Sequence, residues 1–322
     1  MKEFKKYCNK HFPGLSRFKK FKLACDCLKE YFVYGTRVNN YFLYEFYNKT
    51  KSERRAFFTL GEGWNYRRKV NGKEVHQKLK NKRMFNETFS AFIQRDWLYM
   101  AEATQEQFDK FCASHTTYIE KPVNMMNGDG IKIRDASDDN NVGNYQMYAG
   151  KPILLEEVVV ACDVINDLHP TSLNTIRVST MLDKSRTKVT IIAATLRIGT
   201  GGKIIDDFGA ESLAAAIDVG TGVISHMAVD KMGNRYKSHP DTGQLILGIA
   251  IPGWQKVIDL CTKAALSYPD APFIGWDVAV SPTKDGQDHI IQIIEGNDGQ
   301  CFLLIQAPGC VGLKEKIMRA AE

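Results

Sequence analysis

In residues 1–53, apolar side chains recur at steps of three and four positions, the spacing of one face of a helix. A Pro-Gly pair at positions 13 and 14 and a glycine at position 35 interrupt the pattern, and such residues end helices. Several short helices are therefore expected. Further helices are expected over about residues 81–97 and from Thr104, whose hydroxyl can cap a first helical turn.

From about residue 116 the pattern changes to short runs of apolar and β-branched residues bounded by turns. The predicted strands are TTYIEKPV, ILLEEVVV, TIRVSTML, KVTIIAATLRIG, GVISHMAV, WDVAVSP and HIIQIIEGN, with helices predicted at SLAAAI and GWQKVIDLCTKAAL. Many turns are of hairpin length, which favours an α+β fold over a doubly wound sheet. The chain thus divides into a helix-rich region, residues 1–115, and a strand-rich region, residues 116–322.

The composition adds the expectation of a large buried core or of lobes around a cleft, since 44% of the 322 residues are apolar. No apolar stretch approaches the roughly 20 residues of a membrane span. The first residues lack the apolar core of a secretion signal, so a cytoplasmic location is expected. The cysteines have no C-x-x-C spacing, which a zinc site or redox dithiol would use, and are expected to be reduced.

Charge is unevenly distributed along the chain. Residues 1–90 hold 22 Lys and Arg against 8 Asp and Glu, an excess of 14 positive charges, whereas the whole chain carries +6. This basic region indicates attraction to an acidic polymer or an acidic membrane surface; the alternative is a solvated helical face. Specific nucleic-acid binding is not expected, because no zinc-finger, RNP or helix-turn-helix signature accompanies the charge. The sequence does not indicate an oligomeric state.

The strongest chemical signal is a set of oxygen donors on two predicted strands. Asp277 lies in GWDVAV, and Glu295 and Asn297 end IIQIIEGN. Glu295 and Asn297 are two positions apart, so they project from one face of an extended segment. Carboxylate and amide oxygens suit Mg²⁺, and a carboxylate ending a buried strand needs a partner for its charge. The three residues are candidate metal ligands; the alternative is that EGN merely begins a turn.

Two lysines indicate a phosphate site. Lys121 ends a predicted strand just before a turn that holds Gly128 and Gly130, and Lys82 begins a predicted helix. Backbone N–H groups of such a turn can surround phosphate oxygens, while an ammonium group adds positive charge. Each lysine alone would more often be a solvated surface residue, but together with the acidic cluster they indicate a nucleotide site.

The order of these features resembles the ATP-grasp superfamily: a helix-start lysine, a Lys-Pro strand with a glycine loop, an E-E-V-V hinge, an arginine-bearing strand, an aspartate strand and a final E-x-N. HPTSLNTIRV, HPDTGQLILGIAIPGW, IGWDVAV and EGN follow one another as in its sugar-transfer-associated branch, over about residues 55–310. The resemblance implies an α+β ATP-grasp fold. Its nucleotide-binding subdomain would span about residues 116–157 and its metal-binding subdomain about residues 158–322.

The resemblance also implies how ATP would be held. The two lysines match residues that contact the nucleotide phosphates. Glu156, Glu157 and Val158 match the hinge whose backbone reads the adenine edge. Asp163 stands where a ribose-contacting acid often lies.

The same resemblance implies catalytic and metal-binding roles. Arg177 and Arg197 match strand positions that face phosphate or an acyl-phosphate intermediate. A structural ion pair is the alternative for Arg177. Asp277, Glu295 and Asn297 match the ligands of magnesium, with two ions expected.

One segment departs from the family pattern. Related chains tend to place D-N-F before a glycine pair. This chain has DDFGAES, with Asp207 at the asparagine position and Glu211 and Ser212 at the glycine positions. An acidic side chain weakens contact with an anion through its charge and bulk. The segment therefore indicates an unusual acceptor or a reduced activity, and Asp206 and Asp207 are candidate substrate residues.

The turn HPDTG offers two further candidate substrate residues. His239 and Asp241 could orient a substrate, or the histidine could act as a base. A histidine before proline in a loop is more often structural.

The reaction that the resemblance implies joins a small or glycan-linked carboxylate to an amine at the expense of ATP, through an acyl phosphate. Its expected setting is cell-surface polysaccharide or peptide modification. A catalytic serine is not required, and the chain has no G-x-S-x-G motif. Two alternatives remain open at this point: an ATP-grasp kinase, and a nucleotide-binding or scaffold protein with weakened catalysis.

Overall fold

The computed structural model describes residues 2–125, 129–136, 145–202, 212–299 and 301–322. The helices are α1 (Lys2–His11), α2 (Arg17–Tyr34), α3 (Val38–Leu43), α4 (Lys51–Arg55), α5 (Leu60–Lys80), α6 (Lys82–Thr88), α7 (Gln105–Ser114), α8 (Tyr145–Tyr148), α9 (Asp163–Asn166), α10 (Trp254–Ser267), α11 (Phe302–Gln306) and α12 (Lys314–Ala320), with 3-10 turns η1 (Phe46–Asn48) and η2 (Ser90–Phe92). The strands are β1 (Trp97–Tyr99), β2 (Thr117–Pro122), β3 (Lys132–Asp135), β4 (Ile153–Glu157), β5 (Ile176–Leu182), β6 (Val189–Ile198), β7 (Leu213–Ile217), β8 (Ala228–Val229), β9 (Arg235–Tyr236), β10 (Phe273–Pro282) and β11 (His289–Asn297).

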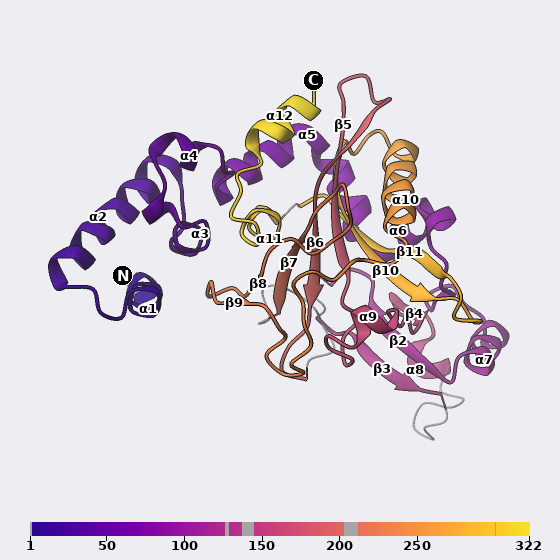
Figure 1. The fold of residues 1–322 in the computed structure, drawn as a ribbon. Helices are drawn as coiled ribbons and strands as arrows, with labels where there is room; N and C mark the ends of the chain where they lie inside the picture. Colours follow the sequence, from indigo (N-terminus) through magenta and orange to yellow (C-terminus); the bar gives the residue numbers. More distant parts are fainter. Residues whose placement is uncertain (1, 126–128, 137–144, 203–211, 300) are drawn as a thin grey trace.

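The first four helices form a small helical unit at one side of the molecule (Figure 1). Ser16 caps α2 by accepting a hydrogen bond from the backbone N–H of Lys19, and Gly35 ends the helix in the left-handed region, with φ of 66°. Its apolar side chains pack around Tyr41 and Phe42, in a cluster that also contains Ala214 of β7 and Leu304 of α11. The predicted series of short helices is confirmed.

Two antiparallel sheets make up the rest of the fold (Figure 1). The smaller sheet has four strands in the order β1-β4-β2-β3, and the larger has seven in the order β11-β10-β5-β6-β7-β8-β9. Neighbouring strands in both sheets run antiparallel, from the β1–β4 pair to the β10–β11 pair. This arrangement agrees with the predicted α+β class.

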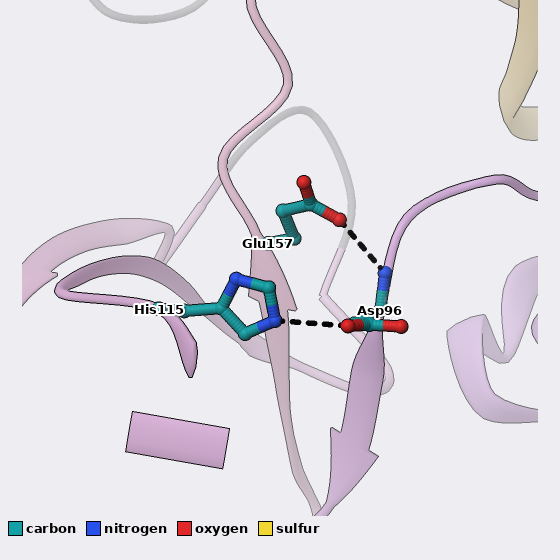
Figure 2. Close-up of side chains that lie close together, drawn as sticks. All are labelled: Asp96, His115 and Glu157. Atoms are coloured by element: carbon teal, nitrogen blue, oxygen red, sulfur yellow. Dashed lines mark hydrogen bonds and ion pairs between the residues drawn. The ribbon is translucent and has the colours of Figure 1, made fainter. Parts of the chain in front are cut away.

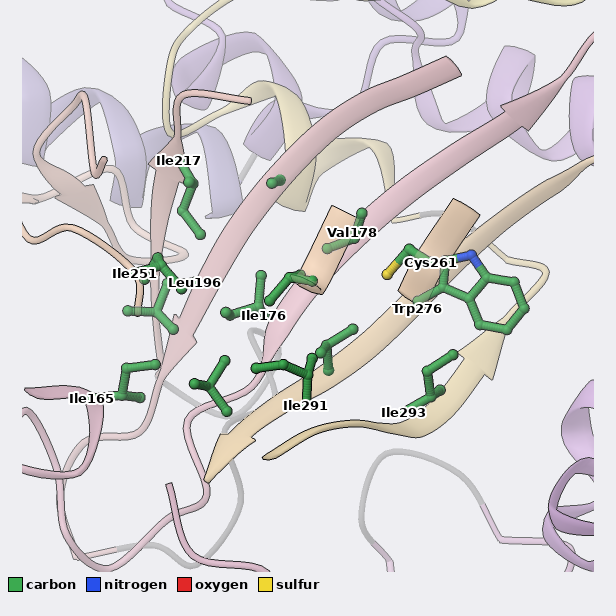
Figure 3. Packing of buried hydrophobic residues seen from close by; sticks show 14 of the residues in the cluster. Ile165, Ile176, Val178, Leu196, Ile217, Ile251, Cys261, Trp276, Ile291 and Ile293 are labelled. Atoms are coloured by element: carbon green, nitrogen blue, oxygen red, sulfur yellow. The ribbon is translucent and has the colours of Figure 1, made fainter. Parts of the chain in front are cut away.

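The larger sheet is covered on both faces. On one face, α10 packs over a cluster that includes Ile176, Val178 and Trp276, side chains that Figure 3 shows along the sheet with Cys261 of α10 among them. On the other face, Phe302 of α11 and Ile317 of α12 pack against Met181 and Phe273, and α5 lies beside them. A strand covered on both faces carries apolar residues at successive positions, and the seven residues of β5 are all buried.

Two local predictions were wrong. SLAAAI, predicted as a helix, is strand β7, which pairs with β6 from Ala194↔Ile217 to Ile198↔Leu213. Alanine favours helices, but five residues are too few for a stable helix, and here the sheet supplies their backbone partners. GVISHMAV, predicted as one strand, contains only the two residues of β8 and isolated bridges at Val223 and Ile224.

The secondary structure does not separate at residue 115. Strand β1 lies within residues 1–115 yet pairs with β4, through Trp97↔Glu156 to Tyr99↔Leu154. Helix α5, kinked at Gly72, contacts β10 and β11. Residues 1–115 therefore supply one strand of the smaller sheet and a helix that packs on the larger sheet.

The cysteines and the lengths of the helices bear on two further predictions. All eight cysteines are free, as predicted, with Cys27 buried and Cys25 exposed on opposite sides of α2. Across the described ranges, no helix combines the length and the apolar character needed to cross a bilayer.

Candidate nucleotide and metal site

A cleft of about 280 Å³ opens between the two sheets. Its walls come from β2, β3 and β4 on one side and from β6, β10 and β11 on the other. A second cavity of about 230 Å³ adjoins it and shares several of its lining residues, among them Lys82, Lys121, Arg197 and Glu295. The two cavities together form one elongated site.

One end of this cleft is apolar. Ile119 of β2 and Ile133 of β3 line the first cavity, and Val158 and Leu173 line it from segments that follow β4 and precede β5. None of these four residues lines the second cavity. Apolar walls with a few polar groups at one end suit a flat organic ring.

The three candidate metal ligands converge at the other end. Asp277 of β10 pairs in register with Glu295 of β11, and Asn297 pairs with Gly275. The amide nitrogen of Asn297 lies 3.3 Å from Asp277 Oδ2 and 3.2 Å from Glu295 Oε1. Two carboxylates and an amide around one point are a donor set that suits a hard divalent cation.

Two arginines hold Asp277 in place. Arg177, opposite Asp277 on β5, donates to it at 2.5 Å from Nε and 3.0 Å from Nη2. Arg197 of β6 donates from Nη1 to Asp277 Oδ2 at 2.8 Å. Burial acts to raise the pKa of Asp277, but the two guanidinium groups hold it well below its ordinary value. Asp277 is therefore ionised at neutral pH.

Glu295 differs from Asp277 although both are carboxylates. Its pKa is raised, first by burial in the cleft and then by the negative charge of Asp277. A divalent cation between the two carboxylates would remove this repulsion. The residues present therefore fit a magnesium site.

A second ion-pair network lies beneath the candidate phosphate site. Lys121 Nζ is 2.5 Å from Glu156 Oε2, and Arg95 Nε is 2.9 Å from the same oxygen. Asn86 donates to Glu156 Oε1 at 3.0 Å. Burial acts to raise the pKa of Glu156, but Arg95 and Lys121 hold it far below its usual range. The carboxylate fixes the position of the Lys121 ammonium group.

Lys82, at the start of α6, reaches across to the strand that carries Lys121. Its ammonium group contacts the backbone carbonyls of Pro122, at 3.3 Å, and Met125. Burial lowers the pKa of Lys82, and Glu295 partly opposes that change. Gly130, in the turn that follows, has φ of 74° and packs against Pro122. Gly128 of the same turn lies outside the described residues.

The predicted hinge follows β4. Glu156 points into the cleft, whereas the carboxylate of Glu157 accepts a hydrogen bond from the backbone N–H of Asp96 at 3.0 Å. Figure 2 shows this contact together with His115, whose Nε2 lies 3.0 Å from Asp96 Oδ2. The three side chains have possible ligand atoms within 4.8 Å of one another. Their hydrogen bonds tie the hinge to the ends of α7 and β1, and Val158 then enters the lining of the cleft.

Several predicted residues are not brought to the cleft. Asp163 is exposed at the start of α9, and Asn166 from that helix lines the cleft instead. His239 is buried, with Nε2 2.8 Å from the carbonyl oxygen of Gly199, and Asp241 accepts from the backbone N–H of Gly201 at 2.7 Å. These two side chains hold the segment after β6, which is a structural role. Asp206 and Asp207 lie outside the described residues.

Arg95 is a site residue that sequence reasoning missed. Its side chain is buried, and besides Glu156 it donates to the carbonyl oxygens of Ile293 at 2.8 Å and Ile294 at 3.0 Å. It thus joins β4 of one sheet to β11 of the other. Its only local signal is an arginine before a tryptophan-led strand, which is too common to single out.

The larger part of the chain matches a family model described as sugar-transfer associated ATP-grasp, over residues 63–321. Among proteins with curated descriptions, no sequence matches significantly. Solved structures similar to this one include the ATP-grasp ligase PsnB complexed with a phosphomimetic variant of a minimal precursor, Mg and ADP, at 16% identity over 78% of this chain and 60% of that chain, with a TM-score of 0.45. Others are D-cycloserine synthetase DcsG (10%, 78% and 73%, TM-score 0.44) and N5-carboxyaminoimidazole synthetase from Staphylococcus aureus complexed with ADP (9%, 69% and 45%, TM-score 0.41).

These structural likenesses are distant, and the chain spans about three fifths of the length of PsnB. The family match is independent of them and covers most of the sequence. It includes both sheets, both lysines and all three candidate metal ligands. The chain belongs to the sugar-transfer associated ATP-grasp family.

Proposed function

We propose that the chain is an ATP-dependent carboxylate–amine ligase that works through an acyl phosphate. The observation that carries the proposal is the convergence of Asp277, Glu295 and Asn297 beside Arg177 and Arg197, at the polar end of a cleft whose other end is apolar. Such a cleft can hold adenine at one end and a triphosphate at the other. Family membership supports ATP as the nucleotide.

In the proposed reaction, a carboxylate oxygen of the acceptor attacks the γ-phosphorus of ATP, and the bond to the β–γ bridging oxygen breaks. ADP leaves with the electron pair, and the acceptor becomes an acyl phosphate. An amine nitrogen then attacks the acyl carbon, phosphate leaves, and the nitrogen releases a proton to solvent. Magnesium, held by Asp277, Glu295 and Asn297, would neutralise charge on the phosphates.

The chain's own residues position the reactants and stabilise negative charge. Lys82 of α6 and Lys121 of β2 line the site, and Glu156 holds the ammonium group of Lys121 in position. Arg177 and Arg197 lie on the opposite wall and line the polar end of the site. Such preorganised cations stabilise a transferring phosphoryl group because they need not reorient during the reaction.

The two substrates are proposed from the family description, sugar-transfer associated ATP-grasp. We propose that the acceptor is a carboxylate of a sugar acid or a peptide, and that the amine is a small molecule. If the acyl phosphate were not intercepted by an amine, the chain would act as a kinase. If the DDFGAES segment prevents turnover, it would act as a nucleotide-binding protein.

One experiment separates these outcomes. The protein is incubated with Mg-ATP and pools of acids and amines, while ADP, phosphate and product mass are followed. Phosphate release that needs both an acid and an amine supports ligation. A stable phosphorylated acid supports the kinase, and thermal stabilisation by ATP without turnover supports nucleotide binding alone.

The metal assignment is tested by Glu295→Gln. This change removes a carboxylate from the candidate magnesium site without unpairing a buried arginine, so we expect a folded protein without Mg-dependent ATP turnover. The matched control is Glu315→Gln on α12, where the carboxylate is exposed and pairs with Arg319 of the same helix. Normal turnover by the Glu295 variant would show that the metal assignment is wrong.

A further inference from the structure

Helix α2 has apolar side chains on two opposite faces. Its inner face packs Leu23, Ala24 and Cys27 into the apolar cluster of the helical unit. Its outer face carries Phe18, Phe21, Cys25, Leu28 and Phe32, which recur at steps of three and four positions and therefore form one stripe. We call these five residues the outer apolar face.

The outer apolar face is strongly exposed. Phe18 is 65% exposed, Phe21 66%, Leu28 45% and Phe32 79%. A helix that is apolar on opposite sides is normally covered on both, and clustered exposed aromatic side chains mark an interaction surface. Three exposed phenylalanines on one stripe would be costly in water, so something is expected to cover them.

The charges around this face have one sign. Arg17, Lys22 and Lys29 flank the stripe and are exposed, and the ammonium group of Lys22 lies 4.7 Å from the ring centre of Phe18. The two acidic residues of α2 face inward instead. Asp26 and Glu30 both pair with Arg54 of α4, at 2.8 Å and 3.1 Å.

This charge pattern argues against a second copy of the chain as the covering partner. Two α2 helices packed along the stripe would place Arg17, Lys22 and Lys29 of one copy beside the same residues of the other, and the like charges would repel. The same cations would be attracted to an anionic surface. Helix α1 carries three more exposed lysines, Lys2, Lys5 and Lys6.

We propose that the outer apolar face of α2 docks the protein on an anionic phospholipid bilayer. The phenylalanines enter the boundary between headgroups and acyl chains, while the flanking lysines contact the lipid phosphates, as in helices that lie in the membrane interface. The helix lies on the bilayer and does not span it. Helix α2 and the smaller sheet are at opposite sides of the molecule (Figure 1), so docking leaves the cleft open to water.

The test is co-sedimentation of the full chain with vesicles. Phosphatidylcholine vesicles are compared with vesicles that also contain phosphatidylglycerol, at low and high salt. We expect binding to the mixed vesicles, weakened by salt. Phe21→Ser and Phe32→Ser should each lower the partition coefficient about tenfold, and Lys22→Gln and Lys29→Gln about fivefold each.

Matched controls come from α10, on the other side of the larger sheet. Leu266→Ser and Lys263→Gln remove an exposed apolar and an exposed basic side chain from that helix, and neither should change binding. Thermal unfolding of each variant checks that the fold is kept.

Three results would overturn the proposal. The first is that wild type does not sediment with the mixed vesicles. The second is that the lysine variants weaken binding but the phenylalanine variants do not, which would indicate a soluble polyanion such as heparin as the ligand. The third is a dimer in analytical ultracentrifugation that Phe21→Ser disperses, which would assign the face to a second copy.

Discussion

The surroundings of Asp277 lead to a quantitative prediction for Asp277→Asn. The side chain is 1% exposed and accepts hydrogen bonds from both Arg177 and Arg197. Asparagine nearly preserves its shape but removes the negative charge. Two buried guanidinium groups would then face a neutral amide.

The expected loss of stability follows from this arrangement. Removing one partner of a buried ion pair costs roughly 3–5 kcal/mol, because a charge stays buried without compensation. Glu295 can offset part of the cost. Without the Asp277 charge one cause of its raised pKa disappears, so it ionises more readily beside the arginines. We therefore expect a loss of roughly 3 kcal/mol and a fall in Tm of about 4–5 °C, because the unfolding entropy of a 322-residue chain is about 0.7 kcal/mol/K.

The measurement is thermal and urea unfolding followed by circular dichroism at pH 7. The matched control is Asp288→Asn, because Asp288 also pairs with a cation, Lys256, at 2.5 Å, but the two side chains are 61% and 52% exposed. An exposed pair contributes only about 0–1 kcal/mol. A third variant, Asp277→Asn combined with Arg177→Gln, should regain part of the lost stability, since the Arg177 charge that Asp277 compensates is removed together with that carboxylate.

Equal stability of Asp277→Asn and Asp288→Asn would contradict the expected loss. So would a further drop on adding Arg177→Gln that equals the full effect of that change alone. Either result would mean that the arginines do not depend on Asp277 for compensation.

Two further variants test other parts of the structure. Glu156→Gln should cost roughly 3–5 kcal/mol at pH 7, because Arg95 and Lys121 lose their buried partner. Since the folded-state pKa of Glu156 lies below its unfolded value, about 4.3, its contribution is complete above that value and is lost as the pH falls below it. Urea unfolding between pH 7 and pH 3 should therefore show the gap between wild type and variant closing on acidification, and a constant gap would contradict the assignment. Gly222→Ala should lower stability by roughly 2–4 kcal/mol, because φ is 74° and a Cβ would lie 2.3 Å from Cγ of Trp254. In Gly243→Ala, with the same φ and open space around it, only the backbone cost of roughly 1 kcal/mol is expected in the same thermal unfolding assay.

Local signals in the sequence predicted the elements that depend on local chemistry. Thr104 caps α7 with a complete capping box, and Gly35 ends α2, as their residue types indicated. The convergence of Asp277 and Glu295 was also predictable, because adjacent apolar strands joined by a short turn pair in register. In the described residues, the predicted cleft residues Lys82, Lys121, Glu156 and Arg197 do share one cleft with them.

The remaining features depend on contacts distant in the sequence. Arg95 binds a carboxylate 61 residues away and a carbonyl 198 residues away, and nothing in its neighbourhood indicates either partner. The β7 segment carries helix-forming alanines, and only the presence of β6 beside it explains why it is extended. Arg177 forms the ion pair that was the alternative to a catalytic role, with Asp277 as its partner, and the catalytic role stays a prediction.

The position of Arg95 also bears on how the two sheets can move. Its guanidinium group holds Glu156 of the smaller sheet and two carbonyl oxygens of β11 of the larger one, so these strands are fastened together at the base of the cleft. A contact that joins the two sheets at one place favours rotation about that contact over sliding. We expect the smaller sheet to rotate about the contacts of Arg95. The displacement should be largest at β3, the strand farthest from β4 in the sheet order. Entry and exit of nucleotide would then be controlled at the β3 side, by rotation rather than by sliding of one sheet along the other.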